Sequence, residues 1–234
     1  MEFEKYNSEK HAEYLPDHHP PNYRDGDIEK FKPVAEEAVS ELKEVVDFDD
    51  DIELILGITD DEELGKNLPT GYYFIGFSFD EGLHDYQENA VFMRASDQPE
   101  KWRAAFKSMF IHELSHQVFY QAGVNWEDNQ YHSIMFEGHA ENLARIVSDK
   151  NGRDFSPVWQ KEEPIEVDKK QLCDDLEKPR GFEGEDHNMF LRGGERWSDA
   201  EGYTISFQIV QHLIEEERVS ITSMLETQSE EWRE

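Results

Sequence analysis

The stretch His112-Glu113-Leu114-Ser115-His116 is an HExxH motif, and it determines how the rest of the chain is interpreted. Two histidines four residues apart on a helix point the same way, because each turns only about 40° past the other. Their ring nitrogens can bind one Zn²⁺, and Glu113 projects to the side where a coordinated water would sit. The motif predicts His112 and His116 as metal ligands and Glu113 as general base.

The sequence around this motif predicts a buried helix over residues 99–121. Apolar side chains point in nearly every direction around it, at Trp102, Ala105, Phe106, Met109, Phe110, Ile111, Leu114, Val118, Phe119 and Tyr120. Two imidazoles and a carboxylate in a core are costly unless something satisfies them. A bound metal ion satisfies these groups. A structural hydrogen-bond network could also satisfy them, but it does not favour the HExxH spacing.

A second helical pattern, over residues 136–144, offers a third ligand. We assign Glu137 as that ligand and Glu141, one turn later, as the acceptor that orients a ligating imidazole. Periodicity leaves the two assignments exchangeable. His139 lies about 200° around the helix from Glu137, so we expect it to pack or to face solvent. Small residues predict a close approach to the HExxH helix: Gly138, Ala140 and Ala144.

Tyr203 is the remaining candidate for catalysis. It begins an apolar stripe that continues at Phe207, Val210 and Ile214, which favours a core tyrosine on an amphipathic helix. The functional interpretation places its hydroxyl at the metal site, where it donates to the oxyanion of a tetrahedral intermediate. His212 points to the opposite side of this helix and is a poor candidate for that role.

These motifs carry a family resemblance. An HExxH helix followed by a glutamate on a second helix resembles the gluzincin arrangement of thermolysin-like peptidases, with Glu141 where that group has aspartate. The chain is more closely similar to the predicted zinc-dependent proteases called DUF2268, through HExxH, the stretch at 137–141 and Gly202-Tyr203, over roughly residues 50–215. That family tends to repeat Gly-Tyr one turn later, where Ser206-Phe207 stands here. The resemblance implies a zinc metallopeptidase that acts on a peptide or protein substrate.

The predicted fold is α+β and zincin-like, with a small mixed sheet packed on the HExxH helix and further helices C-terminal to it. Apolar patterns predict a helix over 27–47 and strands over 52–58, 71–78 and 90–95. The resemblance implies that the last strand lies at the sheet edge above the metal, where an extended peptide can pair with it. Residues 1–26 are expected to form an irregular arm, and residues 27–234 a single domain.

The connecting segments are expected to surround the site. Residues 122–132 are predicted to form a loop along the cleft. Residues 151–200 are charged and weakly periodic, and we expect them to cover the site around a short helix at 169–176.

The composition excludes several classes of protein. The chain has 54 acidic and 23 basic residues and a net charge of −31, spread along its whole length. This favours adaptation to a salt-saturated cytoplasm over a binder of basic partners, and it argues against direct nucleic-acid binding. The single Cys173 excludes an intrachain disulfide. The absence of a signal-peptide pattern and of a long apolar run predicts a soluble, cytoplasmic protein with no membrane partner.

Three alternatives to a general metallopeptidase remain open. The stretch at 141–144, Glu-Asn-Leu-Ala, faintly resembles regulatory peptidases that cleave a transcriptional repressor. A non-catalytic protein could use zinc for folding alone, and an acidic scaffold could do without zinc. Nitrogen and carboxylate ligands also accept Mn²⁺, Co²⁺ or Fe²⁺, although Zn²⁺ is the expected cofactor.

Overall fold

The structure is a computed structural model of the 234-residue chain. It describes residues 2–5, 23–24, 32–49, 53–59, 72–78, 91–94, 99–122, 130–155, 165, 170, 172 and 201–226. The chain divides into two compact units, Met1–Glu113 and Leu114–Glu234. The boundary falls inside one continuous helix, α2, so that this helix belongs to both units.

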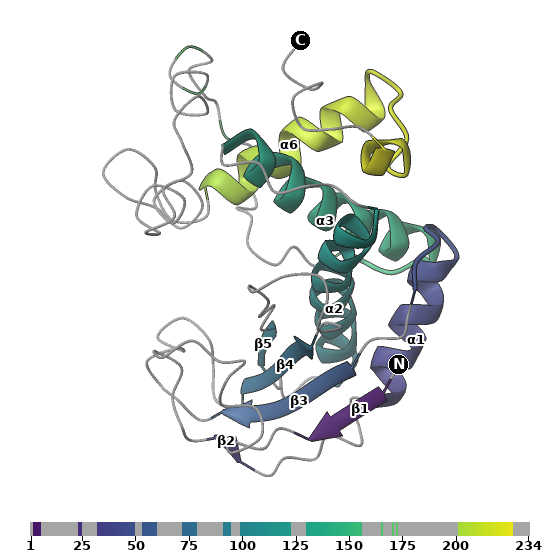
Figure 1. Cartoon of the computed structure of the whole chain (residues 1–234), viewed down its shortest axis with the longest axis vertical. Helices are drawn as coiled ribbons and strands as arrows, with labels where there is room; N and C mark the ends of the chain where they lie inside the picture. The colour runs from purple at the N-terminus through teal and green to yellow at the C-terminus, as the bar shows by residue number, and fades with distance from the viewer. Residues whose placement is uncertain are drawn as a thin grey trace. The chain divides into compact units, whose positions relative to one another are not determined.

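The first unit contains a five-stranded sheet in the order β1-β3-β4-β5, with β2 also paired to β3 (Figure 1). β1 runs parallel to β3, and the other pairs are antiparallel. Aromatic and β-branched residues, which favour strands, dominate the longer ones; in their register Leu54 faces Phe77 and Phe74 faces Phe92. The strands are β1 (Glu2–Lys5), β2 (Tyr23–Arg24), β3 (Glu53–Thr59), β4 (Tyr72–Ser78) and β5 (Val91–Arg94).

Helix α1 (Lys32–Lys43) is amphipathic and shorter than the predicted range of 27–47. Pro33 stands in its first turn, where a missing N–H costs nothing, and Lys43 lies in the last turn, where a cation is favourable. One face of the helix is buried, at Val34, Ala35, Ala38, Val39, Glu41 and Leu42.

A buried ion pair joins α1 to the first part of α2 (Pro99–Gln121). The ammonium of Lys107 lies 2.8 Å from Oε1 of Glu41 and 2.9 Å from Oε2 of Glu37. The Lys107 side chain is only 6% exposed, so the two carboxylates compensate a charge that has lost most of its water. This pairing fixes one turn of α1 against the helix that carries the HExxH motif.

Helix α2 has the bounds that the sequence predicts, residues 99–121. Every residue from 110 to 119 is buried, polar ones included. The prediction of a deeply buried HExxH helix is therefore confirmed.

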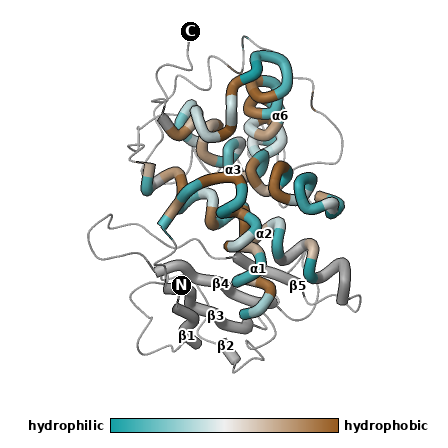
Figure 2. The backbone as a smooth tube through the Cα atoms, turned by 90° about the vertical axis from the view of Figure 1, so that its right-hand side faces the viewer, coloured by the Kyte–Doolittle hydropathy of each residue, from teal (hydrophilic) through white to brown (hydrophobic). Residues whose placement is uncertain are grey.

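The second unit is built on α3 (Gln130–Lys150) and α6 (Glu201–Glu215), which lie against each other, with the short 3₁₀ helix η3 (Ser223–Glu226) following (Figure 1). Apolar and hydrophilic residues are interspersed along both long helices, as expected for helices with one packed face (Figure 2).

The closest approach of α3 to α6 is at Gly138. A Cβ atom added there would collide with the backbone carbonyl oxygen of Ser206 and would lie 2.6 Å from Cγ2 of Val210. The small residue at 138 therefore serves the contact with α6. The expectation that it brings α3 close to the HExxH helix is wrong, because its nearest neighbours all belong to α6.

A polar side chain of α3 reinforces this contact. The amide Nδ2 of Asn142, which is fully buried, donates to the carbonyl oxygens of Gly138 at 2.9 Å and of Phe207 at 3.0 Å. On α6, the hydroxyl of Ser206 donates to the carbonyl of Gly202 at 2.7 Å. The buried residues of α6 are Gly202, Thr204, Ile205, Ser206 and Val210. Of the predicted apolar stripe, Val210 is buried, and Tyr203, Phe207 and Ile214 are half-buried.

The predicted fold class also needs correction. The buried hydrophobic residues that the structure describes lie on α1, α2, α3, α6 and the short segments that follow α1 and α6. The α+β, zincin-like expectation of a mixed sheet packed on the HExxH helix is therefore wrong for the core that carries the motif. The prediction failed because it assumed that the apolar faces of the helices pack against a sheet. Among the described helices, the ion pair of Lys107 joins α1 to α2, the stack of Phe136 on His116 joins α3 to α2, and α6 packs on α3.

Several predictions fall on residues that the structure does not describe. They are most of the arm at 1–26, most of the loop at 122–132 and most of the cover at 151–200, where only Lys170 and Leu172 of the predicted short helix are described as helical. The single domain over 27–234 and the edge strand as a substrate site stay predictions. None of the helices within the described ranges is long and apolar enough to cross a membrane.

Candidate metal centre

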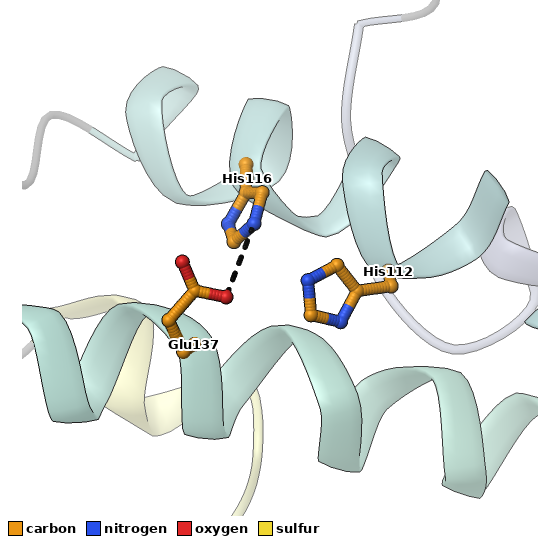
Figure 3. Close-up of side chains that lie close together, drawn as sticks. All are labelled: His112, His116 and Glu137. Atoms are coloured by element: carbon orange, nitrogen blue, oxygen red, sulfur yellow. Dashed lines mark ion pairs between the residues drawn. The ribbon is translucent and has the colours of Figure 1, made fainter. Parts of the chain in front are cut away.

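The two histidines of the motif lie one turn apart on α2, and both are buried. His112 is 2% exposed and His116 is 3% exposed. Because they share one continuous helix, its geometry alone directs both rings to the same side. Figure 3 shows the two imidazoles and the carboxylate of Glu137, which α3 contributes.

Glu137 completes a group of three potential ligands. Oε2 of Glu137 lies 3.8 Å from Nε2 of His116, too far for a good hydrogen bond (Figure 3). One ligand atom from each of His112, His116 and Glu137 lies within 4.8 Å of the other two. Ligands about 2.0–2.1 Å from a tetrahedral zinc ion are roughly 3.3 Å apart, so a small closure of this group would fit the ion. Two nitrogens and one carboxylate oxygen are also the donor set that zinc accepts.

The structure separates the two glutamates whose roles the sequence left exchangeable. The carboxylate of Glu137 belongs to the three-ligand group, and Glu141 does not. Glu141 is buried on the next turn of α3, with 4% of its surface exposed, and Glu113 is buried on α2 with 7% exposed. This placement favours Glu137 over Glu141 as the third ligand.

His139 is a packed core histidine, one of the two environments that the sequence allowed. It is fully buried, and its Nε2–H donates to the carbonyl oxygen of Ile221 at 3.2 Å. Burial lowers the pKa of His139 from 6.5 to about 4, although the hydrogen bond to Ile221 partly opposes the change. The ring is therefore neutral at pH 7 and does not belong to the ligand group.

An aromatic cluster adjoins the ligand group. The ring of Phe136 stacks on the imidazole of His116, with centroids 3.9 Å apart and planes 13° from parallel. Phe119 meets Phe136 edge-on at 5.4 Å, and His132 lies 5.7 Å from Phe136. The sequence argument counted Phe136 only as part of an apolar stripe. Its position directly before Glu137 was the signal that it shares a helical turn with a ligand.

Tyr203 lies beside the turn of α3 that precedes Glu137. Its half-buried ring packs against the buried pair Ile134 and Ile205. It does not belong to the three-ligand group. His212 is exposed near the C-terminal end of α6, and its Nε2 lies 3.8 Å from Oε1 of Glu217.

The model of one protein family matches residues 34–234, and this family is described as "Predicted Zn-dependent protease (DUF2268)". The chain belongs to this family. The resemblance found in the motifs is therefore confirmed, over nearly the whole chain. A search of curated proteins finds no match, and a search of solved structures finds none either. The DUF2268 description agrees with the His112, His116 and Glu137 group, which is compatible with zinc.

Proposed function

We propose that this DUF2268 protein is a zinc metallopeptidase that hydrolyses peptide bonds. The observation that carries the proposal is the convergence of His112, His116 and Glu137 within 4.8 Å, from two helices, in a chain whose family is described as a predicted zinc-dependent protease. Within the described residues this group offers three ligands. Three protein ligands leave a fourth position for water or substrate, which is the pattern of catalytic rather than structural zinc sites.

In this proposal His112 and His116 hold the ion through ring nitrogens, and Glu137 holds it through a carboxylate oxygen. A bound zinc ion supplies Lewis acidity and lowers the pKa of water to near neutrality. Glu113 is the general base: its carboxylate accepts a proton from the attacking water and passes it to the leaving amine. The position of Glu113 directly after the ligand His112, on the same buried turn of α2, supports this role.

Two further side chains have supporting roles in the proposal. Glu141 accepts a hydrogen bond from one of the ligating imidazoles and fixes its orientation; its burial one turn after Glu137 supports this role. Tyr203 donates its hydroxyl to the oxyanion of the tetrahedral intermediate. The support for Tyr203 is its packing against the cluster of Ile134 and Ile205, in which Ile134 stands one turn before Glu137 on α3.

The proposed setting is a salt-rich cytoplasm. The support is the charge of −31, spread along the chain, which self-repels at low ionic strength and is screened within about 3 Å at 1 M salt. The substrate class is a peptide or protein. The same charge disfavours acidic substrates and nucleic acids.

The test is Glu113→Gln, assayed for zinc content and for cleavage of an unstructured protein substrate in molar salt. We expect zinc to stay near the parent level while the turnover falls at least about a hundredfold, the usual range for loss of a general base. Glu36→Gln, at an exposed position of α1, is the matched control and should cleave as the parent does. Parent-like cleavage by Glu113→Gln would exclude the general-base role, and a zinc-loaded parent that cleaves no peptide substrate would favour a folding role for the metal.

A further inference from the structure

The orientation of the His116 ring needs an explanation beyond the helix that carries it. In a histidine the second side-chain torsion is broad, so a helical backbone and a staggered first torsion leave the ring free to turn about its own axis. A ligand works only when the lone pair of one nitrogen points at the ion. Metal sites therefore restrain their imidazoles from outside, and such restraint is commonly worth about 10- to 100-fold in metal affinity.

The stack with Phe136 supplies such a restraint. With centroids 3.9 Å apart and planes 13° from parallel, tilting the His116 ring out of this plane drives its edge into the face of Phe136. The nitrogen that this orientation presents to Glu137 is Nε2, at 3.8 Å from the carboxylate. The stack therefore holds the ring in the orientation that the ligand group requires.

Phe136 itself is held in place. It is 6% exposed, and Phe119, which follows His116 by one turn on α2, meets it edge-on with planes 81° apart. Leu225 of η3 packs against the same pair of rings. Because Phe136 and Glu137 are neighbours on α3, one helical turn carries both a ligand and the ring that orients another ligand.

We propose that Phe136 is a positioning residue of the metal centre, which fixes the ring plane of His116 and thereby strengthens zinc binding. This inference rests on the metal-binding part of the proposed function and not on peptidase activity. It predicts a specific effect on zinc affinity that loss of an aromatic ring outside this cluster does not reproduce.

The chain offers a matched pair of substitutions. Phe136→Leu removes the flat face and keeps apolar bulk. Phe207→Leu makes the same change at a ring that stacks on Phe155, outside the ligand group, and serves as the control. We expect Phe136→Leu to weaken zinc binding about 10-fold or more, measured by competition with a chromophoric chelator, and Phe207→Leu to weaken it less than about threefold. Thermal unfolding of both metal-free variants shows whether their packing losses are comparable.

A conservative variant provides rescue and guards against misfolding. Phe136→Tyr keeps the aromatic face and should bind zinc within about threefold of the parent, and the visible absorption of bound Co²⁺ should match the parent spectrum. A Phe136→Leu variant with parent affinity, or equal losses in the two leucine variants, would overturn the proposal. If Phe136→Leu does not fold, Phe136→Met takes its place, and parent zinc affinity in that variant would also overturn the proposal. A parent chain without zinc affinity refutes the proposed function together with this inference, whereas a zinc-binding parent indifferent to residue 136 refutes only the latter.

Discussion

Nε2 of His116 and Oε2 of Glu137 lie 3.8 Å apart, although they come from different helices. The distance exceeds that of a hydrogen bond and is close to the separation of two ligands on one zinc ion. The packing of α3 on α2, which includes the stack of Phe136 on His116, supports it. The contacts that fix α2 and α3 are therefore as important to the site as the ligands themselves.

The Gly138 contact gives a prediction in which two effects oppose each other. Helix propensity alone would make Gly138→Ala stabilising by about 1 kcal/mol. The new methyl group would, however, meet the Ser206 carbonyl and Val210, so we expect a net loss of about 1–3 kcal/mol in the free energy of unfolding.

The control for this experiment is Gly152→Ala. Gly152 has a positive φ of 62°, and no atom lies within 4 Å of the position that a methyl group would take there, so its substitution carries backbone strain without a steric clash. The Gly152→Ala substitution should lower the free energy of unfolding by about 1 kcal/mol. Urea unfolding measures both, and a Gly138→Ala variant more stable than the parent would contradict the close approach of α3 and α6.

The buried Lys107 gives a second prediction. Lys107→Met leaves Glu41, whose side chain is 11% exposed, without its cation, so the free energy of unfolding should fall by about 3–5 kcal/mol. Arg103→Met is the matched control, because Arg103 pairs with Glu37 at 3.6 Å while both side chains are more than half exposed. That variant should lose no more than about 1 kcal/mol. Equal losses in the two variants would show that the burial of Lys107 does not matter.

The neutral His139 predicts a pH dependence of stability. Its pKa in the folded chain is about 4, against 6.5 for an ordinary histidine, so between these values the unfolded chain binds the additional proton. Stability is therefore lost as the pH falls from 6.5 to about 4, by about 3 kcal/mol for this group. Above pH 6.5 the group contributes no pH dependence.

The measurement compares metal-free parent and His139→Gln by urea unfolding at several pH values. The difference in unfolding free energy between the two should change by about 3 kcal/mol over the window, with the variant losing less on acidification. A constant difference from about pH 7 to about pH 4 would mean that the ring of His139 is already charged, or solvated, in the folded chain.

The sequence predicted the local features of the site well, for identifiable reasons. HExxH spacing fixes the direction of two imidazoles through helix geometry alone, and the apolar residues around it indicated the bounds of α2. The second helix and its glutamates also followed from periodicity. The choice between Glu137 and Glu141 did not follow from periodicity, because residues one turn apart share a face of the helix. Only the packing of α3 on α2 distinguishes them.

The parts that failed depend on contacts between distant segments. A glycine at 138 indicates a close neighbour without indicating which, and the structure shows that this neighbour is α6. The buried face of α6 follows its small residues Gly202 and Ser206, which an apolar stripe cannot reveal. The stack of Phe136 on His116 depends on the relative rotation of two helices. The expectation of a sheet packed on the HExxH helix was wrong for the same reason. The apolar face of a helix does not indicate whether a sheet or another helix packs against it.

The central claim is that His112, His116 and Glu137 together hold one zinc ion. The most direct measurement is the zinc content of protein purified without added metal and dialysed against a weak chelator, for the parent, Glu137→Ala and Glu141→Ala. We expect about one zinc per chain in the parent, almost none in Glu137→Ala, and a smaller loss of affinity in Glu141→Ala. A parent without zinc, or a Glu137→Ala variant that retains it while Glu141→Ala does not, would contradict the account.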